Sequence, residues 1–166
     1  DVTSTTDIVL PEKIYGVEVT SISGDAFNNT QGKTITSVVI PKTIKSIGKE
    51  IFIGCNSLIS ITVDPENQNY SSDNGVLFNK DKSELVKYTQ GNTNTDYTVL
   101  NSVKVIGDNA FKNCTYIENI ILPSSITSIG NNAFEHCTGM TSINLPNGLQ
   151  SIGDSVFYEC YHLTNI

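Results

Sequence analysis

Residues 117–139 read IENIILPSSITSIGNNAFEHCTG, and residues 140–162 read MTSINLPNGLQSIGDSVFYECYH. The two stretches align without a gap and share the pattern L/I/M-x-x-I-x-L-P-x-x-I/L-x-x-I-G-x-x-A/V-F-x-x-C. Pro123 of the first copy, for example, aligns with Pro146 of the second. A fixed period in this range, with apolar positions that recur in each copy, is typical of a solenoid in which every repeat forms one turn.

Each position of the repeat has a physical interpretation. The alternating I-x-L segment predicts a short strand whose two apolar side chains share one face. The proline that follows has no N–H to donate and a fixed φ, so it ends the strand at a corner. The I/L-x-x-I-G segment predicts a second short extended piece that ends at a glycine. In A-F-x-x-C, the spacing of Phe and Cys predicts one helical or 3-10 turn with both side chains directed inward. Stacking at about 4.8 Å per repeat would bury these side chains between repeats.

The pattern extends along the chain and predicts a single domain, residues 1–166. Its predicted parts are a divergent first repeat at 5–34, regular repeats at 35–57, 117–139 and 140–162, an irregular region at 58–116, and a partial repeat at 163–166. The first repeat has extra residues around Tyr15-Gly16-Val17, and Asn28-Asn29-Thr30 stand where the cysteine of the pattern is expected. Terminal repeats commonly diverge because one of their sides faces solvent.

The register changes between Cys55 and Cys114, which lie further apart than two regular repeats require. We interpret the interval as two irregular repeats, 58–84 and 85–116, which start at Leu58 and Leu85. The first contains the polar corner DPENQNYSSDNG, and the second contains the polar loop TQGNTNTD. The alternative is one regular repeat that carries a hairpin of residues 76–88.

The repeat resembles the BspA-like, or Treponema-type, class of leucine-rich repeats of bacterial surface proteins. The signature of that class is similar to LPxxLxxIGxxAFxxC, which is matched here by Leu122-Pro123, Ile129-Gly130, Ala133-Phe134 and Cys137. The resemblance covers nearly the whole chain. It implies an α/β-type leucine-rich-repeat solenoid of mostly short parallel strands with helical or 3-10 turns. About six turns of about 23 residues are expected, two of them irregular. The family often carries a segment like NYSSDNGVLFNKDKSELVKY, which supports the interpretation as two irregular repeats.

Composition excludes some classes of partner. The chain of 166 residues has 17 acidic and 10 basic residues, a net charge of −7, which argues against nucleic acid and against an anionic membrane surface. Hydrophobic residues make up 38% of the chain, enough for one continuous core. The 166 residues contain no apolar run of transmembrane length and no segment that resembles a signal peptide. Membrane insertion is therefore not expected, and the sequence does not decide the cellular compartment.

The four cysteines occupy one position of the repeat and are expected to stack in a single file: Cys55, Cys114, Cys137 and Cys160. No CxxC is present, and the two histidines, His136 and His162, add no ligand-like spacing. We therefore expect buried free thiols that act as small apolar side chains. A disulfide between neighbouring repeats is the alternative, because their Cα atoms can come within bonding range.

No catalytic motif is present. The segment GDSVF at 153–157 is not a G-x-S-x-G elbow, and there is no H-E-x-x-H, P-loop or dinucleotide fingerprint. The acidic corner DPENQNYSSDNG lacks the spacing of a calcium-binding loop. We therefore expect neither an enzyme nor a bound metal or cofactor.

What remains is the outer face of the strands, where outward positions alternate with buried ones. The candidate partner-binding residues are Ser37, Val39, Ser60, Thr62, Asn119, Ile121, Ser142 and Asn144, with Lys87 from the irregular region. Stacking would make them a continuous strip of small polar side chains with two exposed β-branched apolar ones. Short polar residues also simply suit exposed strand positions.

The expected function is a non-catalytic binding or adhesion module that recognises an extracellular or cell-surface protein, or else a glycan, on its repeat surface. The secreted or cell-surface location is implied by the family resemblance. The alternative is a structural spacer that displays another domain at the cell surface. Recognition by the polar loops of residues 64–98 is a further alternative, since long loops on a rigid scaffold often bind partners.

Overall fold

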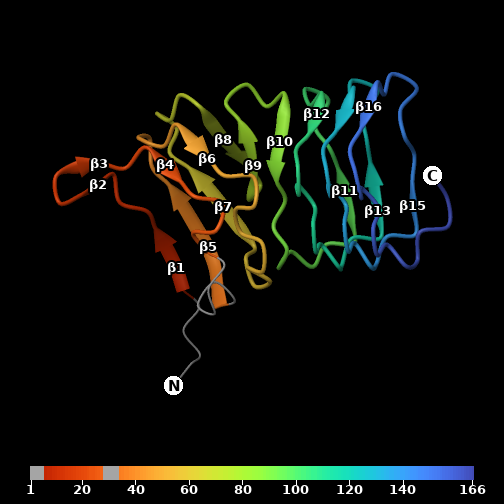
Figure 1. Cartoon of the computed structure of the whole chain (residues 1–166), viewed down its shortest axis with the longest axis horizontal. Coiled ribbons are helices and arrows are strands. Elements are labelled where there is room, and N and C mark those ends of the chain that lie inside the picture. The colour runs from red at the N-terminus through yellow and green to blue at the C-terminus, as the bar shows by residue number, and fades with distance from the viewer. Residues whose placement is uncertain (1–5, 28–33) are drawn as a thin grey trace.

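The repeats stack side by side along the longest axis of the molecule, from the N-terminal to the C-terminal end (Figure 1). The computed structural model describes residues 6–27 and 34–166. Within these ranges it is the expected leucine-rich-repeat solenoid of short, mostly parallel strands. Asn28-Asn29-Thr30 of the first repeat lie outside the described residues.

The I-x-L segments form the first row of strands. One three-stranded parallel sheet consists of β1 (Thr6–Val9), β5 (Ile35–Ile40) and β7 (Ser60–Val63), and another of β11 (Asp96–Thr98), β13 (Asn119–Ile121) and β15 (Ser142–Ile143). Ile120 pairs with Ile143, one period later. The alternation is as predicted, since Ile120 is 4% exposed and Ile121 63% exposed.

The I-G segments form the second row. The strands β4 (Ser21–Ile22) and β6 (Ser46–Ile47) make a two-stranded sheet, and β10 (Glu84–Lys87), β12 (Val105–Ile106), β14 (Ser128–Ile129) and β16 (Ser151–Ile152) pair in parallel. The glycine that ends each I-G segment lets the next repeat approach closely. A Cβ atom on Gly130 would lie 2.6 Å from the backbone nitrogen of Asp108.

From residue 107 onward, the A-F-x-x-C segments form a third ladder between repeats. In these repeats, the residues two before and two after the phenylalanine have positive φ, as at Asn109 (57°) and Asn113 (65°). This alternation excludes a helix and turns the N–H groups towards the following repeat. The N–H of Phe111 donates to the carbonyl of Ala133 (2.7 Å), and that of Phe134 to Val156 (3.0 Å). The residues 6–27 and 34–166 contain no α-helix, so the helical form of the expected turn is wrong. Its 3-10 form is supported by local hydrogen bonds such as that from the N–H of Cys114 to the carbonyl of Phe111 (3.0 Å).

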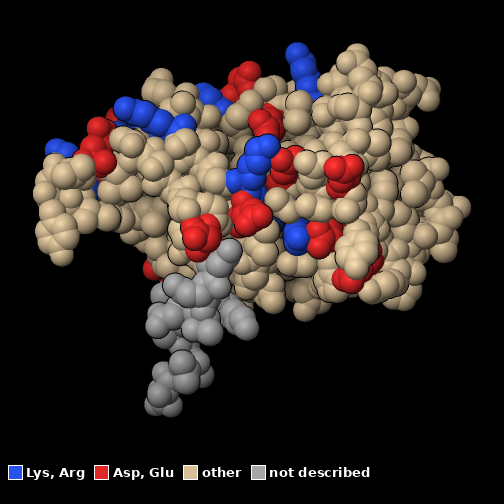
Figure 2. Space-filling model, viewed as in Figure 1, with Lys and Arg blue, Asp and Glu red and all other residues tan. Residues whose placement is uncertain are grey.

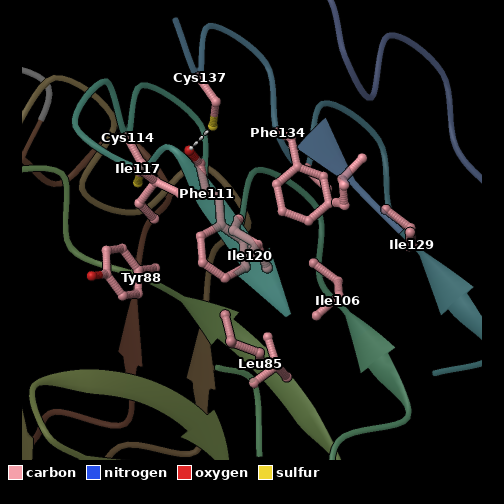
Figure 3. Close-up of a cluster of buried hydrophobic side chains, with 14 of the residues drawn as sticks. Leu85, Tyr88, Ile106, Phe111, Cys114, Ile117, Ile120, Ile129, Phe134 and Cys137 are labelled. Carbon is pink, nitrogen blue, oxygen red and sulfur yellow. Dashed lines mark hydrogen bonds between the residues drawn. The ribbon is translucent and has the colours of Figure 1, made fainter. Parts of the chain in front are cut away.

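The phenylalanine of each repeat stacks on that of the next. Phe111 lies 5.1 Å from Phe134 between ring centroids, and Phe134 lies 5.7 Å from Phe157. Tyr88 continues the stack, 5.2 Å from Phe111. Figure 3 shows Tyr88, Phe111 and Phe134 following one another inside the cluster, with Leu85, Ile106 and Ile129 along one side.

The irregular region contains an antiparallel meander. The strand β9 (Val76–Asn79) pairs with β8 (Tyr70–Asp73) on one side and with β10 on the other. Leu85 lies in β10, within the second row, while the strand that pairs with β13 is β11. The boundary expected at Leu85 therefore does not coincide with the start of a repeat, and a hairpin of β9 and β10 occupies residues 76–87.

The strand β9 divides the apolar core in two. Val76, Leu77 and Phe78 are all buried, but Leu77 packs in the N-terminal cluster, whereas Val76 and Phe78 pack in the C-terminal one. Successive side chains of a strand point to opposite faces, so β9 lies between the two clusters and contributes side chains to both. The core is therefore not the single continuous one that the sequence predicted.

The extra residues of the first repeat form a small hairpin of β2 (Lys13–Ile14) and β3 (Val17–Glu18), which projects from the N-terminal end in Figure 1. Its two turn residues, Tyr15 and Gly16, have φ values of 50° and 81°, as tight hairpin turns require.

Cys114, Cys137 and Cys160 lie together in the C-terminal core cluster, as expected, but Cys55 packs in the N-terminal cluster, so the four cysteines do not form the single file that the sequence predicted. The last two thiols also make hydrogen bonds. Cys137 Sγ donates to the carbonyl of Phe111 (3.1 Å), as Figure 3 shows, and Cys160 Sγ donates to that of Phe134 (3.0 Å). The four residues are free cysteines; Cys55, Cys114 and Cys137 are buried and Cys160 is half-buried. Burial raises the pKa of the Cys55 thiol to about 11 and that of Cys114 to about 12.

We expect alkylation to follow this burial. In native protein at pH 8, iodoacetamide should label Cys160 first and leave Cys55, Cys114 and Cys137 nearly unreacted, because only an exposed thiolate attacks. Denatured protein should take up four labels in the same assay, read by mass spectrometry. Fast labelling of Cys137 in folded protein, or a disulfide found without reductant, would contradict the buried thiol stack.

Candidate binding surface

The predicted strand-face residues lie in two patches. The N-terminal patch comprises Asp7, Val9, Ser37, Val39, Ser60 and Thr62, and the C-terminal patch comprises Asp96, Thr98, Asn119, Ile121, Ser142 and Asn144. Within each patch the registers align the side chains across the strands. Ser37 is paired with Ser60, and Asn119 with Ser142.

The two patches are not one continuous strip, which corrects the expectation from stacking. Among the described strands, β7 has β5 as its neighbour in its sheet, and β11 has β13. The turn between β8 and β9 lies next to β7, where the N–H of Ile61 donates to the carbonyl of Gly75 (3.0 Å). The inserted meander thus separates the patches.

Hydrogen bonds between repeats order the polar side chains of both patches. Ser37 Oγ donates to Asp7 Oδ1 (2.7 Å), and Asn119 Nδ2 donates to Asp96 Oδ1 (3.0 Å). Hydrogen bonds from Asn119 and Thr95 lower the pKa of Asp96, so the C-terminal patch carries a negative charge near neutral pH. Each patch therefore presents an ordered carboxylate beside exposed apolar groups, Val9 (71% exposed) and Ile121 (63%).

Four patch residues were not predicted from the sequence: Asp7, Val9, Asp96 and Thr98. They belong to the divergent first repeat and to the irregular region. Asp96 and Thr98 lie one period before Asn119 and Ile121, and they pair with them. The one-period spacing from Asn119 and Ile121 is the sequence signal that could have identified Asp96 and Thr98 as patch residues.

Lys87 is not a surface residue, which corrects its assignment as a partner-binding residue. It is 1% exposed, and its Nζ donates to the carbonyl of Asn109 (2.8 Å). Gln90 Nε2 similarly donates to the carbonyl of Lys112 (2.9 Å). The repeat that precedes residues 107–114 has no A-F-x-x-C segment, so these two side chains bind carbonyl groups of the neighbouring repeat. Lys87 is therefore structural.

Burial lowers the pKa of Lys87 below its ordinary value of 10.5. Between the folded-state pKa and 10.5, the unfolded chain binds a proton that the folded chain has lost, so stability should rise with pH across that window. We expect Lys87→Met to remove this rise. In urea titrations, the stability of wild type relative to Lys87→Met should increase with pH by at most about 1.4 kcal/mol per unit. A pH-independent difference would contradict the lowered pKa.

The polar corner at 64–75 is held in place by Asn67, which is fully buried. Its Nδ2 donates to the carbonyls of Pro41 (2.9 Å) and Ile44 (3.0 Å), and its Oδ1 accepts from the N–H of Asn69 (2.8 Å) and Tyr70 (2.9 Å). These hydrogen bonds fix the corner on the preceding repeat. It is an ordered surface beside the N-terminal patch.

A model of the BspA type leucine rich repeat region matches residues 1–95 and 83–166, in six copies. Among solved structures, a leucine-rich repeat protein from Eubacterium ventriosum is similar at 28% identity and a TM-score of 0.83, over 95% of this chain and 41% of that one. The pneumococcal vaccine antigen PcpA (23%, TM-score 0.72) is similar over 91% of this chain and 42% of its own length. A leucine rich cell surface protein from Faecalibacterium prausnitzii is similar at 20% identity and a TM-score of 0.63, over 95% of this chain and 52% of that one.

The chain thus spans about half or less of these three proteins. The similarities to PcpA and to the Faecalibacterium prausnitzii protein, at 23% and 20% identity, concern the fold alone. A comparison with curated protein sequences gives no match. No helix within the described ranges is long and apolar enough to cross a bilayer.

Proposed function

Because the chain belongs to the BspA-type leucine-rich repeat family, we propose that it is a non-catalytic binding module of a secreted or cell-surface protein. Its partner is an extracellular or cell-surface protein, which it contacts through the strand-face patches. The surface location rests on the family resemblance of the repeat sequence.

The observation that supports this proposal most is the C-terminal patch. Ile121 is 63% exposed on a strand whose neighbours fix its position on both sides. An apolar side chain held on a rigid ladder loses little conformational entropy on binding. The carboxylate of Asp96 beside it, and the net charge of −7, favour a partner with a neutral or basic surface.

The alternative function is a structural spacer. The two functions differ in one observable, which is saturable binding. Immobilised protein should be screened against extracellular-matrix proteins and surface glycans. A binding module retains a partner at a saturable level, whereas a spacer retains none. Absence of a saturable partner across that panel would favour the spacer.

Substitutions in the C-terminal patch should separate binding from stability. We expect Ile121→Glu to abolish partner binding, because it places a charge in the apolar centre of the contact, and to change the free energy of unfolding by less than about 0.5 kcal/mol. Charged substitutions of Val39 and Asn144 test the rest of the surface in the same way. Binding is measured by surface plasmon resonance and stability by urea titration.

Tyr158→Glu is the matched control. Tyr158 is 58% exposed, and it occupies the repeat position of Glu135 and Lys112, on the A-F-x-x-C side of the solenoid. This variant should bind as wild type does. If Tyr158→Glu abolished binding and Ile121→Glu did not, the binding surface would lie on that other side. Binding lost only on substitution of an exposed loop residue, such as Gln68→Glu, would assign it to the irregular region.

A further inference from the structure

A groove of about 450 Å³ lies where the inserted meander interrupts the second row of strands. In the described part of the chain, β6 pairs with β4 but has no strand on its other side. There, the N–H of Ile47 donates to the hydroxyl of Tyr70 (3.0 Å) instead of to a strand. The ion pair between Lys49 and Asp108 (2.7 Å) connects the two sides of the groove.

The groove combines an apolar floor with hydrogen-bonding groups of both kinds. Ile47 and Val86 are half-buried and supply aliphatic surface. Lys45 and Asn69 are exposed donors, and the half-buried Glu84 is an acceptor. Burial and the neighbouring Asp108 raise the pKa of Glu84, which has no ion pair within the described residues.

The charges of the groove balance one another. Two cations, Lys45 and Lys49, line it together with two carboxylates, Glu84 and Asp108. Figure 2 shows acidic and basic side chains gathered near the middle of the visible face, whereas its C-terminal part is mostly uncharged. A strongly charged ligand would meet a like charge in this groove. A neutral polyol would not, since each hydroxyl can donate to a carboxylate and accept from an ammonium or amide.

From this arrangement we propose that the groove between β6 and β10 binds a neutral oligosaccharide. Sugar hydroxyls pair with Lys45, Asn69 and Glu84, and the C–H face of one sugar ring lies on Ile47 and Val86. The volume fits the lower part of the range for small-ligand sites. This site is independent of the strand-face patches and adds a second specificity to the module.

The test uses the full chain with methyl-labelled Ile and Val, titrated with neutral trisaccharides of glucose, galactose, mannose and N-acetylglucosamine. At least one should shift the Ile47 and Val86 methyl resonances saturably. A galacturonic acid trimer should bind at least about tenfold more weakly, because of Glu84 and Asp108. No shift with any neutral sugar, or equal binding of the acidic trimer, would overturn the proposal.

Lys45→Glu should weaken binding of the neutral sugar at least about tenfold, because a donor is lost and the charge balance is broken. Lys104→Glu is the matched control. Lys104 is also exposed and precedes a V-I-G segment as Lys45 precedes S-I-G, but it lies outside the groove. Equal loss in both variants would contradict the site. Val86→Trp, which fills the groove, should abolish the shift of the remaining reporter, Ile47, in a variant whose cooperative melting curve shows that it is folded.

Sugar binding in the groove and protein binding at the strand-face patches can be tested separately. Ile121→Glu should leave sugar binding unchanged, and Lys45→Glu should leave protein-partner binding unchanged. If a short extended peptide shifted the Ile47 resonances and no sugar did, the groove would be a strand-addition site along β6, and the sugar proposal would be wrong.

Discussion

Replacing Cys137 with aspartate is expected to lower the free energy of unfolding by about 3–5 kcal/mol. The side chain is fully buried, and its Sγ donates to the carbonyl of Phe111 (3.1 Å). An ionised carboxylate at this position would lose its hydration and would meet that carbonyl oxygen without a hydrogen to donate. Urea titration at pH 7 measures the loss, which should shrink at acidic pH as the carboxyl group becomes protonated.

Cys160→Asp is the matched control, at the same position of the following repeat. Cys160 is half-buried, so the new carboxylate keeps part of its hydration and the loss of stability should be clearly smaller. An unchanged unfolding curve for Cys137→Asp, or an equal loss of stability in both variants, would contradict the burial of Cys137 away from water.

A substitution that restores the repeat pattern is expected to destabilise the protein. Gly91 lies one period before Cys114, and Tyr88 stacks on Phe111, so Gly91 holds the position of the cysteine. A Cβ atom at Gly91 would lie 2.5 Å from the carbonyl carbon of Ser57 and 2.7 Å from its oxygen. Gly91→Cys should therefore cost about 3 kcal/mol or more, because backbone must move to make room.

Gly148→Cys provides the comparison. A Cβ atom at Gly148 would meet its nearest neighbour, the carbonyl oxygen of Ser124, at an ordinary 3.5 Å. We expect its stability to lie within about 0.5 kcal/mol of wild type. Thermal and urea unfolding measure both variants. If Gly91→Cys were as stable as wild type, the close approach of residues 57–58 to residue 91 would be wrong.

The regular repeats could be predicted from the sequence because each position of the pattern has one physical role. Ile120 is buried and Ile121 exposed because strand side chains alternate, and Cys114, Cys137 and Cys160 lie in one cluster because they share a position in consecutive repeats. The A-F-x-x-C segment was predicted less well. A three-residue spacing is compatible with a helical turn. Asparagine and histidine are enriched in left-handed backbone, so Asn109 and His136 did carry a signal, but Ser155 and Glu159 at the same positions of the last repeat did not.

The candidate site could be predicted in part for a different reason. Outward strand positions follow from period two, so Ile121 and Asn144 were placed by their neighbours in the repeat. Lys87 was misplaced because the meander puts β10 in the second row, where this side chain turns inward to Asn109. An insertion that extends the second row as an antiparallel meander cannot be located by period alone, and the groove beside β6 lies next to it.

The central claim is that partners bind the strand face, and a photo-crosslinker tests it most directly. A benzoylphenylalanine side chain is introduced at Ile121 in one variant and at Glu135 in another, and each is irradiated with the partner retained in the screen. Binding through the C-terminal patch predicts a covalent adduct from position 121 and none from position 135. An adduct from position 135 alone would contradict it.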